Sequence, residues 1–127
     1  MKIKIPVIIL VGLMLMDYAF YPEGFYRVVQ TLSQFGVPIY VTENGIADSK
    51  DNLRPLFINR YLYALSRAIK DGYDVKGYFY WSLLDNFEWS FGFDKEFGLY
   101  SVNLNTQERE LKRGAKQYQT IVRKFSR

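Results

Sequence analysis

The stretch from Ile39 to Gly45, which reads IYVTENG, constrains the fold of this chain more than any other. Its first three residues are β-branched or aromatic, as pleated and packed strands favour. Asn44-Gly45 tolerates the positive φ of a turn, so we expect the strand to end there. Glu43 would then be the last residue of a buried strand. The carboxyl ends of strands are where α/β folds bind ligands.

A second carboxylate lies in a similar setting further along the chain. The run from Tyr80 to Trp89, which reads YWSLLDNFEW, predicts a strand that passes into a loop with a carboxylate between aromatic residues. Aromatic rings can cover the apolar face of a pyranose ring, and carboxylates accept charge-assisted hydrogen bonds from hydroxyl groups. Glu43 alone could equally be a solvated loop carboxylate. The pattern of Glu88 and Trp89 favours a sugar site over that alternative.

Two segments, one before and one after the Glu43 strand, have the apolar spacing of a helix. The first begins at Pro22, a residue suited to the first helical position, and ends at Gly36. The second begins after Asp51 or Asn52, either of which can cap it, and ends at Gly72.

A strand over residues 75–81 follows, so the order is helix, strand, helix, strand. This alternation is typical of βαβ units with a parallel sheet and indicates an α/β fold. Further on we expect a short strand over residues 97–102, a turn over residues 103–106 and a final helix over residues 111–125.

The residue types that are present limit the chemistry. The chain has 127 residues, a length that suggests no more than one domain. It contains neither Cys nor His. Disulfides, thiolate nucleophiles and imidazole ligands are therefore excluded, and any acid–base chemistry falls to carboxylates. No metal or organic cofactor is implied. The net charge is +4 without a dense Lys/Arg block, so we expect no nucleic-acid partner.

Residues 1–16 differ from the rest. Lys2 and Lys4 precede an apolar run over Ile5–Met16, which is shorter than the ~20 residues of a membrane span. The run has the length of a signal-peptide core, but no small-x-small cleavage site follows. A buried strand and a remnant of unrelated coding sequence are the other interpretations. We therefore separate this apolar segment of undetermined origin from residues 17–127. We expect a cytoplasmic location, with secretion or anchoring through residues 1–16 as the alternative.

The two long motifs resemble those of family 1 glycoside hydrolases, the β-glucosidase and β-galactosidase family, with archaeal members most alike. The run from Ile39 to Gly45 is similar to the family's nucleophile motif, and the run from Trp81 to Trp89 is similar to its sugar-binding loop. Tyr21–Gly24 and Phe97–Tyr100 resemble further family segments, so the resemblance covers residues 17–127. The family fold is a (β/α)8 TIM barrel of ~250 residues or more. The resemblance thus implies the C-terminal part of such a barrel, its last two βα units, and hence an incomplete barrel.

The resemblance also implies a function and its residues. A retaining β-glycosidase hydrolyses O-glycosyl bonds through a carboxylate nucleophile, and Glu43 matches that residue. Trp81 matches the aromatic platform of the sugar subsite, and Phe97 matches an aromatic residue lining it. Glu88 and Trp89 match the residues that hydrogen-bond the sugar hydroxyls. The expected ligand is a β-glycoside, whose sugar and aglycone the sequence does not specify.

The sequence departs from the family pattern in several respects, which include Asn103 where an Asp is usual and Gly114 where a Ser is common. A retaining enzyme needs a second carboxylic acid ~5 Å from the nucleophile, which the family carries in an Asn-Glu-Pro motif that does not occur here. We therefore expect the isolated chain to be inactive. In addition, Glu96 stands where a basic residue is usual, which we expect to weaken a local ion pair.

Other functions remain open. A few strands of a barrel leave parallel edges exposed, which closed barrels abolish. The chain could therefore be one half of a split glycosidase that binds an upstream fragment, or it could self-associate. It could also be a non-catalytic carbohydrate-binding fragment that uses Trp81, Glu88 and Trp89.

Overall fold

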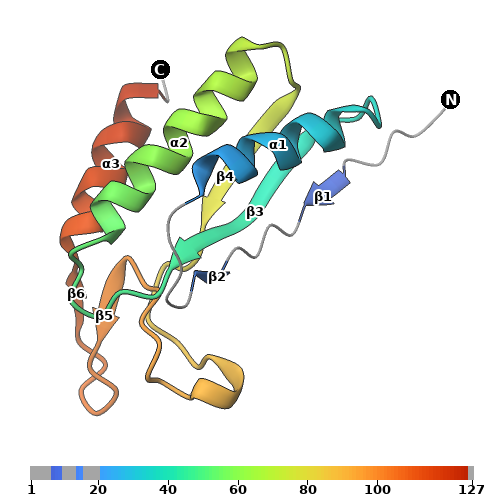
Figure 1. Ribbon diagram of the computed structural model, residues 1–127. Helices are drawn as coiled ribbons and strands as arrows, with labels where there is room; N and C mark the ends of the chain where they lie inside the picture. The colour runs from blue at the N-terminus through green and yellow to red at the C-terminus, as the bar shows by residue number, and fades with distance from the viewer. Residues whose placement is uncertain (1–6, 10–13, 16–20, 126–127) are drawn as a thin grey trace, which may run out of the picture.

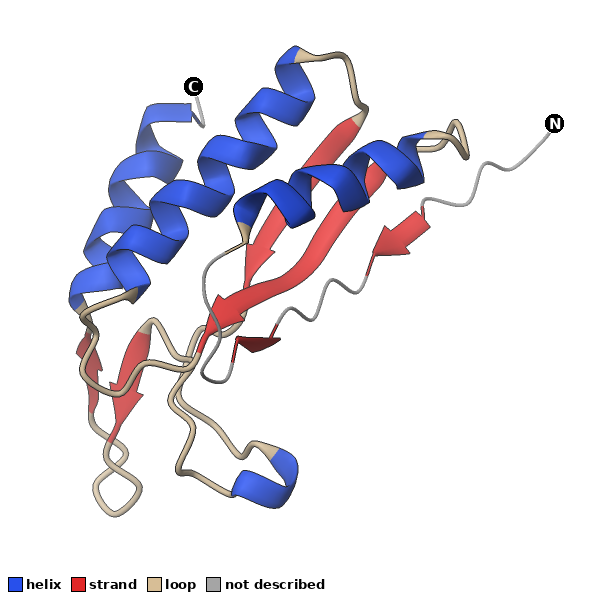
Figure 2. Ribbon diagram, viewed as in Figure 1, coloured by secondary structure: helices blue, strands red, loops and turns tan. Residues whose placement is uncertain are grey.

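The computed structural model describes residues 7–9, 14–15 and 21–125. In this part of the chain, all three helices lie on one side of a parallel sheet (Figures 1 and 2). The strands of this sheet are β1 (Val7–Ile9), β2 (Met14–Leu15), β3 (Ile39–Ile46) and β4 (Val75–Tyr80). The helices are α1 (Pro22–Ser33), α2 (Arg54–Lys70) and α3 (Arg113–Phe125).

The centre of the sheet is β3, which has parallel neighbours on both sides. On one side β1 pairs with its first residues and β2 with its last, and on the other side β4 runs along its length. The predicted α/β fold with a parallel sheet is confirmed. Among the described residues the sheet does not close into a barrel. The short strands β1 and β2 add a third strand position, in the segment for which a buried strand was one of the interpretations.

Most of the apolar segment over residues 1–16 lies outside the described residues, including the stretch where a cleavage site was sought. Its described parts are the short parallel strands β1 and β2. The expected cytoplasmic location and the alternative of anchoring through this segment stay predictions. No helix within the described residues is long and apolar enough to cross a membrane.

The cap of α2 differs from the prediction. Neither Asp51 nor Asn52 receives the first free backbone N–H groups of the helix. The N–H groups of Leu53 and Arg54 donate instead to the carboxylate of Asp48, at 2.7 and 2.9 Å. The carboxylate that caps the helix thus comes from further back in the β3–α2 loop, and Asp51 is engaged elsewhere, as described below.

The apolar core lies between the sheet and the helices. Its fully buried residues include Phe25 of α1, Val41 of β3 and Phe57 and Tyr61 of α2. The rings of Phe57 and Tyr61 stack with centroids 4.1 Å apart, and Phe25 packs on Tyr61 at 5.4 Å. Burying each such side chain contributes about 1.5–3 kcal/mol, so this layer holds α1 and α2 against β3.

No helix of the described residues covers the opposite face of the sheet. A Cβ atom on Gly77 would meet the ring of Tyr40 and approach that of Phe79, so these three residues share a face. Phe79 is 58% exposed. Aromatic side chains on this face therefore remain open to solvent.

The C-terminal part contains a hairpin that was predicted only in part. The antiparallel strands β5 (Tyr100–Val102) and β6 (Arg109–Leu111) flank a turn at Asn103, where the turn was expected. The side chain of Asn103 accepts hydrogen bonds from two backbone N–H groups of the turn. The sequence did not indicate β6, because a three-residue strand with two charged residues has no detectable alternation.

Buried tyrosines make the stability of this layer dependent on pH. Tyr78 and Tyr80 of β4 pack on Tyr118 of α3, with ring centroids 6.2 and 6.1 Å apart. Burial raises the pKa of all three hydroxyls. The phenols are therefore protonated to higher pH in the folded chain than in the unfolded chain, where their pKa is about 10.

We expect the free energy of unfolding to fall as the pH rises above about 10, because the unfolded state then releases protons that the folded state retains. The fall should be smaller in Tyr78→Phe, which removes one of these hydroxyls. Urea unfolding at neutral and alkaline pH measures both effects. Tyr63→Phe, at an exposed position of α2, is the matched control and should behave as the parent chain. If the free energy of unfolding falls as much in Tyr78→Phe as in the parent chain, the Tyr78 hydroxyl does not contribute to the pH dependence.

Candidate active site

An irregularity in β3 decides which way Glu43 faces. Val41 pairs with Tyr78, and Asn44 pairs with Tyr80. These two pairs are three residues apart along β3 but only two residues apart along β4, so β3 contains one extra residue, a β-bulge. Val41 and Asn44 are both buried beneath the helices, at 0% and 1% exposure. Side chains of a regular strand alternate between faces, and these two share a face because of the bulge. Glu43, directly before Asn44, therefore faces the open side of the sheet.

Asn44 joins β3 to β4 next to Glu43. Its side-chain oxygen accepts a hydrogen bond from the Tyr78 hydroxyl at 2.9 Å, and its backbone carbonyl accepts one from the Trp81 N–H at 3.1 Å. Its Nδ2 atom is buried and has no hydrogen-bond partner within the described residues. Glu43 and Trp81 consequently lie on neighbouring strands, each one residue from the rung where Asn44 pairs with Tyr80.

Gly45 has a different role from the one predicted. The strand does not end at Asn44-Gly45 but continues to Ile46, and Gly45 does not have a positive φ. A Cβ atom at this position would collide with the backbone carbonyl of Trp81. Glycine is therefore required for the close approach of the two strand ends, not for a turn.

Phe97 lies beside Trp81. The peptide bond between Trp81 and Ser82 is cis. The Ser82 N–H donates to the Phe97 carbonyl at 3.3 Å, and the Ser82 carbonyl accepts from the Leu99 N–H at 2.9 Å. Phe97 is 2% exposed but does not belong to the main core cluster. The structure thus brings Glu43, Trp81 and Phe97 to the same end of the sheet.

Glu88 and Trp89 lie on the long loop between β4 and β5, which projects beyond the strand ends on the side away from the helices (Figure 1). A short 3-10 helix, η1 (Trp89–Phe91), forms its tip. Glu88 is 4% exposed, whereas Trp89 is 80% exposed and has a φ of +42°. The two residues therefore differ in surroundings, and Trp89 adopts a backbone conformation that is uncommon for a bulky residue.

A buried cation that sequence reasoning missed lies beneath the site. Arg54 of α2 is fully buried, and its guanidinium donates to the Tyr80 hydroxyl at 3.1 Å and to the carbonyls of Asp48 and Glu96 at 3.0 and 2.7 Å. It also forms an ion pair with Asp51. Burial opposes its charge, but Tyr80 and Asp51 outweigh this and raise the pKa of Arg54. The available signal was an arginine within the apolar stripe of a predicted helix.

Glu96, which stands where the family pattern has a basic residue, forms an ion pair in the structure. Its carboxylate lies 3.0 Å from the Nζ atom of Lys112, which precedes α3. The acidic residue at this position thus has a basic partner that is distant in sequence.

Comparison with known proteins identifies the family. The sequence model of glycosyl hydrolase family 1 matches residues 10–126. The chain belongs to this family. It is 58% identical over 89 residues to the β-galactosidase of Pyrococcus woesei, over 70% of this chain and 18% of that protein. The solved β-glycosidase from Pyrococcus horikoshii is 42% identical, with a TM-score of 0.82 over 93% of this chain and 28% of that one. The β-glucosidase from Thermotoga maritima in complex with glucoimidazole is 33% identical, with a TM-score of 0.81 over 87% and 28%.

The predicted family, including its similarity to archaeal members, is therefore confirmed. The chain spans only 18% of the length of the Pyrococcus woesei relative. Its structural neighbours in family 1 are TIM barrels, and the open α/β unit described here is consistent with part of such a barrel. The family match starts at residue 10, within the apolar N-terminal segment.

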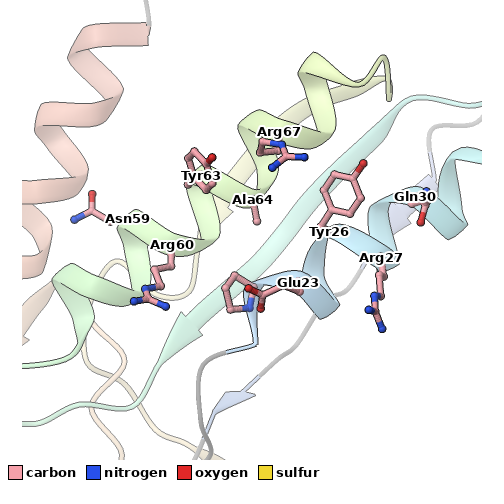
Figure 3. A pocket seen from close by; sticks show the side chains of 10 residues that line it. Glu23, Tyr26, Arg27, Gln30, Asn59, Arg60, Tyr63, Ala64 and Arg67 are labelled. Atoms are coloured by element: carbon pink, nitrogen blue, oxygen red, sulfur yellow. The ribbon is translucent and has the colours of Figure 1, made fainter.

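Grooves elsewhere on this family 1 chain do not include the predicted site residues. One groove of about 680 Å³ lies between α1 and α2 and is lined mainly by polar and charged side chains (Figure 3). Another of about 680 Å³ lies between α2, α3 and β4 and is mainly apolar. Both are on the helix side of the sheet. The described residues contain no cluster of acidic side chains that could hold a metal ion.

We expect Gly45→Ala to lower the free energy of unfolding by about 2 kcal/mol or more, because the added methyl group must push the Trp81 carbonyl away. Gly77→Ala is the matched control on the neighbouring strand. Its methyl group would meet the ring of Tyr40, a side chain that can move. Urea titrations of both variants test the difference. Equal losses would show that the approach of Gly45 to Trp81 is not the constraint.

Proposed function

We propose that the chain is the C-terminal part of a retaining β-glycosidase, its last βα units, with Glu43 as the nucleophile. The observation that carries the proposal is the bulge in β3, which turns Glu43 to the open side next to the strand end that bears Trp81. Neighbouring strands are about 4.8 Å apart. A sugar ring bound against Trp81 would therefore lie within reach of the Glu43 carboxylate.

In a retaining mechanism the Glu43 carboxylate attacks the anomeric carbon while the glycosidic bond breaks and a general acid protonates the leaving oxygen. Water then attacks the glycosyl-enzyme and releases Glu43. We propose that Trp81 supplies the apolar platform for the sugar and that Phe97 packs at its side. The Glu88 carboxylate accepts hydrogen bonds from sugar hydroxyls, and the Trp89 indole N–H donates one.

The general acid has to come from the rest of the barrel. The chain contains no Asn-Glu-Pro motif, and general acid–base catalysis contributes typically about 10²–10⁴-fold. We therefore expect the isolated chain not to turn over an unactivated β-glycoside.

A second candidate function is binding to that remainder, as one half of a split enzyme or through self-association. Among the described residues β4 has a strand partner only on its β3 side. The apolar groove beside β4 includes Val75, Tyr78 and Ile121, and its rim carries Phe125, which is 74% exposed. An unpaired parallel edge next to exposed apolar side chains favours the addition of a strand and its helix.

Complementation with a relative tests both proposals. The partner is the Pyrococcus woesei β-galactosidase cut before the segment that aligns with this chain. We expect neither piece alone to hydrolyse a β-galactoside and the mixture to do so. Glu43→Gln in this chain should lower the restored rate by roughly 10⁴-fold, as loss of a nucleophile does. Glu23→Gln, at an exposed position of α1, is the matched control. Restored activity that survives Glu43→Gln would refute the assignment of Glu43 as the nucleophile. If the two pieces co-purify but the mixture remains inactive, the result supports the binding proposal and contradicts the catalytic one.

Covalent labelling tests Glu43 without the missing acid. A 2,4-dinitrophenyl 2-deoxy-2-fluoro-β-glucoside has a leaving group that departs as an anion, and the fluorine slows release of the glycosyl-enzyme. We expect mass spectrometry to find the fluoroglucosyl group on the peptide that contains Glu43 and to find none in Glu43→Gln. A label on another carboxylate would overturn the assignment. Binding of glucoimidazole without any label would instead indicate a carbohydrate-binding fragment.

A further inference from the structure

The loop over residues 85–96, here called the site loop, carries Glu88 and Trp89 but adds nothing to the main core. No residue between Tyr80 and Leu99 belongs to the core cluster. The aromatic residues of its tip are largely exposed, Phe87 at 61% and Trp89 at 80%. Its ring contacts are internal to the loop. The position of the site loop relative to the sheet therefore depends on its two ends.

One side chain from outside the loop bridges those ends. The Lys112 Nζ atom lies 2.8 Å from a carboxylate oxygen of Asp85, at the start of the site loop, and 3.0 Å from one of Glu96, at its end. The side chain of Lys112 is 8% exposed, that of Asp85 14% and that of Glu96 35%. The backbone N–H of Lys112 donates to the Leu99 carbonyl at 3.0 Å, which places the ammonium at the base of the loop. Within the described residues no other side chain bonds to both ends.

We propose that Lys112 is a positioning residue for sugar binding: it joins Asp85 to Glu96 and so holds Glu88 and Trp89 at the strand end that bears Glu43. The sugar-binding part of this inference rests on the proposed function, whereas the structural part does not. An ammonium group has three donors and can serve two carboxylates at once. Without it, the two carboxylates would face one another across a partly buried space and repel.

The other contacts of the loop ends do not replace this bridge. The Arg54 guanidinium and the Asp48 N–H both donate to the Glu96 carbonyl, but these bonds hold one end only. The start of the loop is also joined to the segment after its end, because the Asp85 carboxylate accepts from the Gly98 N–H at 2.7 Å and the Asp85 N–H donates to the Tyr100 carbonyl at 3.0 Å. Neither of these bonds reaches the Glu96 side chain. Loss of the Lys112 ammonium would therefore remove the link between the Asp85 and Glu96 carboxylates and leave them to repel, while β3 and β4 stay paired.

Limited proteolysis with chymotrypsin measures this loosening directly, because Phe87, Trp89, Phe91 and Phe93 are cleavage sites within the loop. We expect Lys112→Met to raise the rate of cleavage in the site loop about tenfold, since opening then no longer breaks the ion pairs. Lys112→Arg should retain both ion pairs and restore slow cleavage. Lys116→Met, at an exposed position in the first turn of α3, is the matched control. It should be cleaved in the site loop at the same rate as the parent chain.

A second variant covers the case in which Lys112→Met does not fold. Glu96→Gln keeps the ammonium on Asp85 and weakens only the other ion pair, so we expect a smaller rise in cleavage. Urea titrations of every variant separate loop opening from global unfolding. The proposal is overturned if folded Lys112→Met, or folded Glu96→Gln where Lys112→Met does not fold, is cleaved in the loop no faster than Lys116→Met.

Fluorosugar labelling then tests the link to sugar binding. We expect Lys112→Met to raise the half-saturating concentration of the dinitrophenyl fluoroglucoside several-fold with little change in the limiting rate of labelling, because Glu43 is untouched. A lower limiting rate at unchanged half-saturation would overturn a positioning role in binding. If the parent chain is not labelled at all, the proposed function fails, and the proteolysis result still decides whether Lys112 holds the loop.

Discussion

The ladder between β3 and β4 at Asn44 is the contact on which the rest of the candidate site depends. The Asn44 carbonyl accepts from the Trp81 N–H, and the Tyr78 hydroxyl holds the Asn44 side chain beneath the sheet. Because Asn44 is held on the helix side, Glu43 must face the opposite side. Burial of the Asn44 side chain with its Nδ2 atom unpartnered costs about 1–3 kcal/mol, and the buried aromatic layer around it offsets that cost.

Arg54 connects this ladder to the loops that follow it. A single buried guanidinium bonds to Tyr80 at the end of β4, to the β3–α2 loop at Asp48 and Asp51, and to the end of the site loop at Glu96. Removing one partner of such a buried pair typically costs about 3–5 kcal/mol, because a charge is left without compensation. The end of β4, the start of α2 and the end of the site loop are therefore coupled, because a change at one of them alters the hydrogen bonds that Arg54 makes to the others.

The sequence predicts those parts of the fold that follow from local patterns. Helix α1 begins at the predicted Pro22, and β3 and β4 are parallel as the alternation of elements indicated. The orientation of Glu43 could not be derived in this way, because one bulge reverses the alternation of faces and no residue type marks it. Likewise, the pairing of Lys112 with Asp85 and Glu96 joins residues far apart in sequence. The charge at position 96 looked unfavourable until that partner was located.

The supports of the site differ in kind, and this determines how it can evolve or be altered. Glu43 and Trp81 are positioned by backbone pairing and by a glycine that admits a close approach, so almost any side chain at Gly45 would disturb them. Glu88 and Trp89 lie on a loop whose base carries the ion pairs of Lys112 with Asp85 and Glu96. Ion pairs can be weakened by single substitutions without disrupting the sheet. The placement of Glu88 and Trp89 is therefore more easily altered by single substitutions than the placement of Glu43 on its strand.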